Sequence, residues 1–244
     1  MAQGGGKTTA TIEARLEVPN VSGFQVVSVA LKETLSGRTL VDVEVASAED
    51  VEWGSALLAQ CVLTIEEIHA ATRTVNKSRT WTLKLGEARF LQHVGTQIRY
   101  VLRLRDTLWP LGLGLSTRKY RNKSAQQIVT QLLDEAGIAH RFQLADALPV
   151  RKYTAQYRET NLAFLSRLME FEGIHYSFEE DGTVVFGDTS PSAARLRGGA
   201  PYPLLEGADG MARGDVGLHE LRRGARITTR KVTPSTKVTK RNVI

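Results

Sequence analysis

The sequence predicts an α+β fold that is mainly β, with antiparallel barrel-like subdomains and two short helices. Five runs between residues 24 and 104 alternate apolar and polar side chains, as strands with one buried face do. Two later segments repeat apolar residues at helical spacing, and a glycine follows each of them. With 244 residues, of which 42% are hydrophobic, the chain can bury a substantial core.

Residues 1–20 are expected to form a flexible leader, because Gly4, Gly5 and Gly6 lie near their start. Gly6-Lys7-Thr8 resembles the end of a phosphate-binding loop. However, the leading glycine of that motif would fall on Met1, and no strand precedes it to hold the loop. The segment therefore predicts no nucleotide site.

Residues 21–120 are expected to form the first β-barrel-like subdomain. Its alternating runs are Phe24–Ala30, Thr39–Ala46, Ala59–Ile65, Ser78–Leu85 and Gln97–Leu104. Short strands separated by turn residues favour an antiparallel sheet that curls. Cys61 is the only cysteine and lies in an apolar run, so the sequence excludes an intrachain disulfide and predicts a buried, unreactive thiol.

Residues 121–188 are expected to form an α+β part built of strand, helix and hairpin. The first helix follows a capping box of Ser124 and Gln127 and ends at Gly137. A strand over 153–157 then leads to Thr160, whose side chain is placed to cap a second helix that ends at Gly173.

The second helix is expected to bury one face, and a hairpin is expected to follow it. The buried residues predicted from helical spacing are Leu162, Phe164, Leu165, Leu168, Met169 and Phe171. Residues 174–178 and 183–186 alternate like two strands joined by an acidic turn that contains Gly182.

The second helix and its approach resemble the tail-hub domain shared by VgrG, the spike protein of type VI secretion systems, and the hub proteins of contractile phage tails. The matching residues are Gln156, Tyr157, Glu159, Thr160, Phe164, Arg167, Leu168, Glu172, Gly173 and Ile174. Asn161 stands where the family pattern has Asp, which removes a carboxylate worth about 0.3 to 1 kcal/mol from the first helical turn. Residues 102–111, with Trp109 and Pro110, look like the family's strand ending in an apolar element.

The resemblance implies the hub of a puncturing spike in a contractile injection machine. Such a hub is a homotrimer that joins a sixfold tube to a threefold spike and carries effectors. Its partners would be the tube protein, baseplate subunits, and spike-tip or effector proteins. The alternative is the baseplate tail hub of a contractile phage or phage-derived particle.

The resemblance also suggests which residues are structural or lie at a subunit interface. These are Trp109, Pro110, Gln156, Tyr157, Glu159, Thr160, Arg167 and Gly173. For Tyr157 we favour the protomer core over the interface, because aromatic residues in alternating strands are usually buried. Glu159 is better explained by a hydrogen bond between elements than by catalysis.

We predict that the chain is not an enzyme and holds no catalytic residue, metal ion or cofactor. Glu66 and His69 have Glu-x-x-His spacing, but a di-metal site needs a second such pair. The acidic groups at 170–172 and 179–181 are expected to be solvated, so they lack the raised pKa of a glycosidase acid. A third candidate function is that of a hub that also hydrolyses peptidoglycan.

The net charge of +6 is concentrated at one end, because residues 222–244 contain eight Lys or Arg and no acidic residue. Residues 189–217 are expected to be a loop or insertion, and 218–244 a basic β-ribbon that continues beyond this sequence. The basic segment lacks aromatic residues, so we expect no nucleic-acid partner. Nucleic-acid binding through this segment is the less favoured alternative.

The apolar runs are short, the longest being about ten residues against roughly 20 needed to cross a bilayer. The N-terminus also lacks the apolar core of a signal peptide. We therefore expect no stable membrane insertion. The resemblance implies assembly in the cytoplasm and export by contraction, without a cleaved signal.

Overall fold

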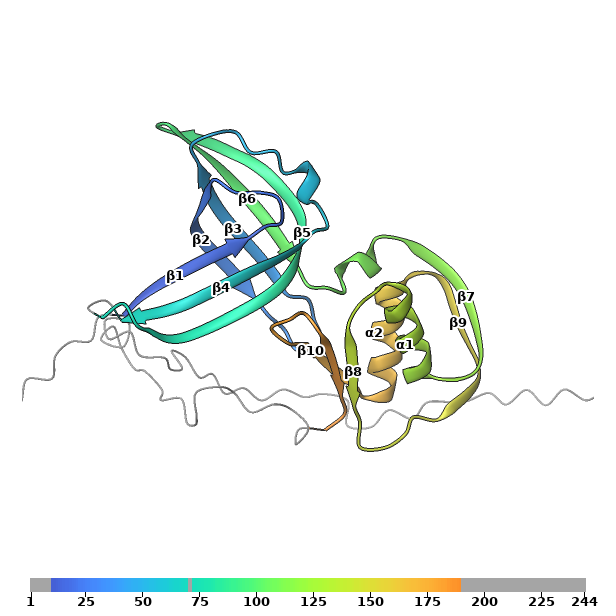
Figure 1. Ribbon diagram of the computed structural model, residues 1–244. Coiled ribbons are helices and arrows are strands. Elements are labelled where there is room, and N and C mark those ends of the chain that lie inside the picture. Colours follow the sequence, from blue (N-terminus) through green and yellow to red (C-terminus); the bar gives the residue numbers. More distant parts are fainter. Residues whose placement is uncertain (1–9, 70–71, 190–244) are drawn as a thin grey trace, which may run out of the picture. The chain divides into compact units, whose positions relative to one another are not determined.

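The computed structural model describes residues 10–69 and 72–189 (Figure 1). The strands are β1 (Ala10–Glu17), β2 (Phe24–Lys32), β3 (Leu40–Ser47), β4 (Gln60–His69), β5 (Val75–Val94), β6 (Gln97–Arg105), β7 (Leu115–Ser124), β8 (His140–Gln143), β9 (Val150–Thr160), β10 (His175–Phe178) and β11 (Val184–Gly187). The α-helices are α1 (Ala125–Glu135) and α2 (Asn161–Glu172), and the 3-10 turns are η1 (Gly54–Ala56) and η2 (Trp109–Gly112). This content confirms the predicted α+β class, mainly β with two helices.

The first six strands form one antiparallel sheet in the order β1-β4-β5-β6-β3-β2. Figure 1 shows that this sheet is strongly curled. Each of the five strands predicted between residues 24 and 104 is present. The edge strands β1 and β2 are consecutive in the chain, and Val18 and Val21 form an isolated bridge within the turn between them.

The prediction of a flexible leader was wrong for residues 10–17, which form β1. This strand pairs with β4 from Ala10 opposite His69 to Glu17 opposite Val62. Leu16 is buried in the sheet's core. The backbone hydrogen bonds and this burial come from a strand about 50 residues away, which local composition does not reveal. Residues 1–9 lie outside the described part of the chain.

Strand β5 turns the corner of the sheet. Its first half pairs with β4 and its second half with β6, and the register shifts between Leu85 and Glu87. Gly86 lies at this shift, and a Cβ there would stand 3.3 Å from Arg105 Cγ and 3.4 Å from Trp109 Cη2. The close approach favours glycine and lets one long strand serve both neighbours.

Alternation in β3 and β6 separates the core from a charged outer face. Val41, Val43 and Val45 of β3 are fully buried, as are Leu102 and Leu104 of β6. On the other face, arginines of β6 pair with carboxylates of the adjoining strands. These contacts are Arg99 with Glu44, Arg103 with Asp42 and Glu87, and Arg105 with Asp42.

Apolar residues between Leu108 and Phe186 form a second core around the two helices. Strands β7 and β9 pair as an antiparallel ribbon, and β10, β11 and β8 form a small sheet in which β8 and β11 are parallel. Strands β7 and β8 were not predicted. Strand β7 spans position 120, where the two expected subdomains meet, and pairs within the helical part.

Packing of α2 agrees with its predicted face except at one position. Leu162, Phe164, Leu165, Leu168 and Met169 are buried. Phe171 was predicted to be buried as well, and this was wrong because its side chain is 78% exposed. It lies near the helix end, where the guanidinium of Arg151 covers one ring face at 4.6 Å from the centroid.

A buried carboxylate links the two cores. Asp106 is 2% exposed and accepts hydrogen bonds from the backbone N–H of Thr39 at 3.1 Å and of Leu108 at 3.0 Å. Burial raises the pKa of this carboxyl, while the two N–H donors and the charge of Arg38 oppose the rise. Leu108 and Leu111, just beyond the turn, belong to the second core.

The turn between β10 and β11 also contacts the six-stranded sheet. Thr82 Oγ1 donates to the carbonyl of Glu180 at 2.7 Å, and Thr107 Oγ1 donates to that of Gly182 at 2.9 Å. Gly182 has φ +84°, and a Cβ there would lie 2.9 Å from Thr107 Cγ2. Glycine is therefore required both for the turn and for this approach.

The loop or insertion expected over 189–217 and the basic ribbon expected over 218–244 lie outside the described residues, apart from residue 189.

Cys61 offers a test of the first core. Its side chain is fully buried, and burial raises the pKa of the thiol to about 11 from an ordinary 9.0. At pH 8 the native protein should therefore hold about a hundredfold less thiolate than an exposed cysteine. We expect slow reaction with a chromogenic disulfide reagent in buffer and rapid stoichiometric reaction in urea. Rapid reaction in buffer would contradict the burial.

Asp106→Asn tests the carboxylate that links the two cores. One of the two buried N–H groups would then face an amide N–H₂ instead of an acceptor, at a cost of about 1 to 3 kcal/mol in unfolding free energy. Burial raises the folded-state pKa above the ordinary value of 3.8. The stability contributed by Asp106 is therefore fully present below pH 3.8 and declines as the pH rises through the higher, folded-state pKa. The cost of the substitution, measured by urea unfolding, should therefore be smaller at pH 7 than at pH 4.

The matched control is Asp146→Asn, since Asp146 is exposed. Equal costs for the two substitutions would show that Asp106 is not a structural link.

Candidate functional site

Strand β9 leads directly into α2 at a joint, and a capping residue lies at each end of the helix. Thr160 has extended backbone angles, and its Oγ1 accepts a hydrogen bond from the N–H of Ala163 at 3.0 Å. Gly173 ends the helix in the left-handed conformation with φ 72°. Both roles agree with the sequence prediction and set where the helix begins and ends.

An ion pair ties the end of β9 to the second turn of α2. Arg167 Nη2 donates to Glu159 Oε1 at 2.6 Å, and Arg167 Nε donates to Oε2 at 3.3 Å. Arg167 Nη2 also donates to the carbonyl of Ala155 at 3.2 Å. Because the Arg167 side chain is 52% exposed, the pair orients the two elements more than it stabilises them.

Gln156 is the buried member of the joint, with 1% exposure. Its Nε2 donates to the backbone carbonyl of Glu159 at 3.2 Å and to Asn161 Oδ1 at 2.9 Å. The Asn found in place of the family's Asp therefore still supplies an acceptor. What it lacks is the negative charge at the helix N-terminus.

Tyr157 lies on the outer surface, so the interpretation that favoured its burial was wrong. Its side chain is 71% exposed. Alternation in β9 explains this position, because Thr154 and Gln156 are buried and Tyr157 falls on the opposite face, in phase with the exposed Tyr153. A bulge follows, in which Tyr157 and Arg158 together lie opposite Thr117 of β7 and Arg158 has φ 47°. The N–H of Arg158 donates to Thr117 Oγ1 at 3.2 Å instead of to a strand carbonyl.

Trp109 and Pro110 do not end a strand as expected. Strand β6 stops at Arg105, and both residues belong to η2, which follows the Asp106 turn. The Trp109 side chain is half-buried and lies beside Gly86 of β5. Pro110 fits the first turn of such a short helix because it has no N–H to leave unpaired.

The acidic and histidine groups weighed for catalysis lie in β4, at the end of α2 and in the turn between β10 and β11. The prediction that the acidic groups are solvated was wrong for Glu172, whose side chain is only 10% exposed. His69 is the last residue of β4, and its Nδ1 accepts from the N–H of Thr72. Glu172 pairs with Arg151, and Glu179 pairs with Arg141. Hydrogen bonds from Thr183 lower the pKa of Asp181, which is the opposite of what a general acid needs.

Over residues 10–69 and 72–189, no three His, Cys, Asp or Glu side chains gather closely enough to hold a metal ion. Among the helices described for this chain, none is long and apolar enough to cross a membrane.

Comparison with known families identifies the chain. A family model described as the phage tail baseplate hub (GPD) matches residues 32–240. The chain belongs to this baseplate hub family. The joint between β9 and α2 and the turn at Asp106 both lie within the matched region of this hub protein.

The hub chain is also similar to curated spike proteins. It is 43% identical over 109 residues to the type VI secretion system spike protein VgrG5 of Pseudomonas aeruginosa, a match that covers 40% of this chain and 14% of that protein. Against spike protein VgrG3 of Vibrio cholerae it is 35% identical over 114 residues, which covers 45% of this chain and 11% of the relative. The matched region is thus a small part of each relative's length.

Among solved structures, the hub chain resembles the E. coli c3393 protein, described as a component of the type VI secretion system with structural similarity to the T4 bacteriophage tail proteins gp27 and gp5. The TM-score is 0.65 at 24% identity, over 74% of this chain and 51% of that chain. At this identity the likeness establishes a shared fold.

One group of surface residues was missed by the sequence analysis. Strand β7 was not predicted, although its segment alternates cations with other residues at Lys119 and Arg121. Pairing with β9 brings these cations beside Tyr153. Alternation could have indicated the strand, but not which side chains would be its neighbours.

Asn161→Asp tests the electrostatics of the joint. A carboxylate would keep the acceptor for Gln156 and add a favourable charge at the helix N-terminus, raising the unfolding free energy by about 0.3 to 1 kcal/mol at pH 7. The gain should disappear below about pH 3, because the lowered folded-state pKa of such an Asp confers stability that is lost as the carboxylate is protonated. Denaturant unfolding at both pH values measures it.

Asn161→Ala is the matched control, since it removes the acceptor and should lower stability. An Asp variant no more stable than the original chain at pH 7 would contradict the proposed geometry.

Proposed function

We propose that this chain is the structural hub region of the puncturing spike of a type VI secretion machine. The observation that carries the proposal is the 43% identity to the spike protein VgrG5, in a chain that belongs to the baseplate hub family. In this role the hub joins a sixfold tube to a threefold spike as a homotrimer. Its further partners are baseplate subunits and spike-tip or effector proteins.

The hydrogen bonds between the two cores suit a protein that transmits force. The two cores are linked by the buried Asp106, and the turn at Gly182 is hydrogen-bonded to the six-stranded sheet. Bonds at several points restrict hinge motion between the cores. A hub under load during contraction needs this resistance, because a flexible link would absorb the stroke.

The family-motif residues take two roles in this proposal. Gln156, Glu159, Thr160, Arg167 and Gly173 shape the protomer through the contacts at the joint. Trp109, Pro110 and Tyr157 retain exposed surface and are available for contacts with other chains. Heterologous contacts repeated around a threefold axis would close such a ring.

We further propose that the hub region is not catalytic. Glu172 and Glu179 pair with arginines, and Asp181 accepts a hydrogen bond from the N–H of Thr183. A bacterial wall hydrolase would need one carboxylic acid with a raised pKa facing a cleft. The hub would assemble in the cytoplasm and leave the cell with the spike when the sheath contracts.

Assembly and secretion together test the hub function. We expect light scattering to give a native mass of about 81 kDa, three times the chain mass of 26.9 kDa. In the source bacterium, Leu165→Asp, which buries a charge in the second core, should abolish release of the tube protein into the medium.

Asp146→Asn, at an exposed position, is the control for secretion and should leave release unchanged. A monomer in solution together with normal tube-protein release by the Leu165→Asp strain would refute the hub function.

A further inference from the structure

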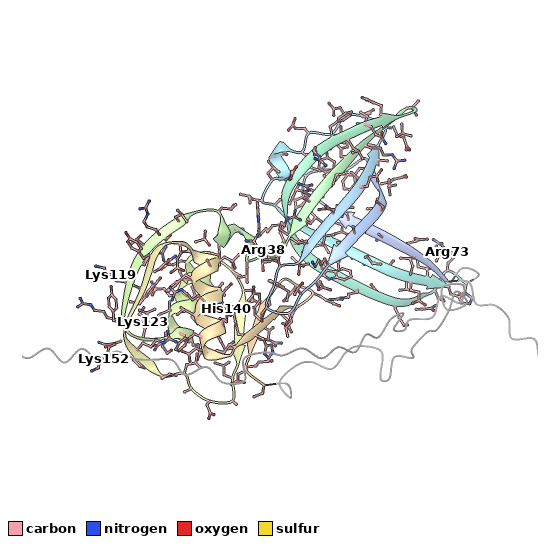
Figure 2. The ribbon with its side chains drawn as sticks, turned by 180° about the vertical axis from the view of Figure 1, so that it is seen from behind. Arg38, Arg73, Lys119, Lys123, His140 and Lys152 are labelled. Carbon is pink, nitrogen blue, oxygen red and sulfur yellow. The ribbon has the colours of Figure 1, made fainter. Side chains whose placement is uncertain are left out.

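The outward side of the β7–β9 ribbon carries cations and exposed apolar side chains together. We call Leu115, Lys119, Arg121, Tyr153 and Tyr157 the cationic ribbon face. Leu115, Tyr153 and Tyr157 are 69%, 52% and 71% exposed, and Lys119 and Arg121 are also exposed. Arg121 lies directly across the ribbon from Tyr153. Figure 2 shows Lys119 on the side of the ribbon away from α1 and α2.

Cations on the opposite side of the ribbon are neutralised within the protomer. Arg118 pairs with Glu135 of α1, and Arg151 pairs with Glu172 of α2. Tyr120, between the cations of β7, is buried against the ring of Phe164. The helical side of the ribbon is therefore satisfied in both charge and apolar contact.

The outward cations have no such carboxylates. No ion pair found among the described residues includes Lys119, Arg121, Lys152 or Arg158. The one acidic residue in β7 and β9 is Glu159, and Arg167 of α2 engages it. The cationic ribbon face and its flanks thus present positive charge without a local counterion.

The bulge in β9 contributes to this surface. Arg158 adopts φ 47°, a conformation that costs free energy for a residue with a side chain. The bulge leaves Arg158 exposed next to Tyr157, which is in phase with the exposed Tyr153 and stands outward beside the cations. Tyr and Arg are, with Trp, the residue types enriched where protein interfaces concentrate their binding energy.

We propose that the cationic ribbon face docks an acidic segment of another protein in the assembly. Carboxylates of the partner would pair with Lys119 and Arg121, and its apolar side chains would pack on Tyr153 and Tyr157. Tyr153 and Tyr157 could also stack on bases, so a DNA competitor is included in the test below. An acidic protein segment is the better occupant, because Leu115 and the 64%-exposed Val150 add aliphatic surface at the ribbon's ends, on which bases do not stack. The proposal deepens the hub function and rests on it for the partner's place in the machine.

The probe is a fluorescent synthetic peptide of alternating Glu and Leu, about ten residues long to match one strand of the ribbon. The full chain is titrated against it by anisotropy, and a peptide with Gln in place of Glu shows the contribution of charge. Lys119→Glu combined with Arg121→Glu should weaken binding at least about tenfold. Lys32→Glu with Arg89→Glu makes the same change in net charge at exposed positions of the six-stranded sheet and should weaken binding less than about threefold.

A second pair of substitutions separates contact from charge. Tyr153→Ala with Tyr157→Ala should weaken peptide binding about tenfold while leaving its salt dependence unchanged, because the cations remain. Both tyrosines are exposed, so the melting temperature should not change. The basic segment 222–244 is the same in every variant and contributes an equal background.

If the peptide binds, three outcomes would still overturn the inference. These are equal losses in the ribbon and sheet charge variants, no effect of the tyrosine substitutions, or binding of a single-stranded DNA of similar length that matches the peptide and is lost in the same variants. The native mass is recorded on the same samples. A trimer with no peptide binding would refute only the docking inference, and a monomer that binds the peptide would refute only the hub assembly.

Discussion

The buried carboxylate of Asp106 fixes the turn by which the chain passes from its first core to its second. The Asp106 carboxylate accepts one hydrogen bond from the N–H of Thr39, in the β2–β3 connection. It accepts another from the N–H of Leu108, in the turn after β6. A carboxylate with this little exposure is tolerable because both backbone donors satisfy it. Its two bonds redirect the chain from the sheet into η2, where Leu108 and Leu111 enter the second core. The contacts of Trp109 with Gly86 and of Thr107 with Gly182 follow from this turn.

Different interactions set the limits of α2 and its orientation. Its limits are set locally by Thr160 and Gly173, within a few residues of each helix end. Its orientation is set by Arg167, which reaches back to Glu159 and Ala155 of the preceding strand. The buried Gln156 then closes the joint from inside. A motif that is short in sequence thus controls how a strand, a turn and a helix meet.

Local sequence patterns predicted the elements better than the exposure of single aromatic residues. The alternation of Val41, Val43 and Val45 identified a core strand because neighbours in a strand face opposite sides. In β9 the rule puts Tyr157 on the face opposite the buried Thr154 and Gln156, so the prediction failed there because it took the aromatic side chain for the buried one. It also failed to separate β1 from a flexible leader, because the pairing partner of β1 is β4, which is distant in the chain.

The sequence by itself determined the α+β class, the five central strands, both helices with their caps, and the resemblance to tail hubs. These features depend on spacing and capping over a few residues, so they can be read from one chain. Only the tertiary structure decided that Asp106 is buried, that Phe171 and Tyr157 are exposed, and that Arg121 lies beside Tyr153. Such properties depend on which distant segments pair and pack against one another, and a few residues of local sequence do not specify that.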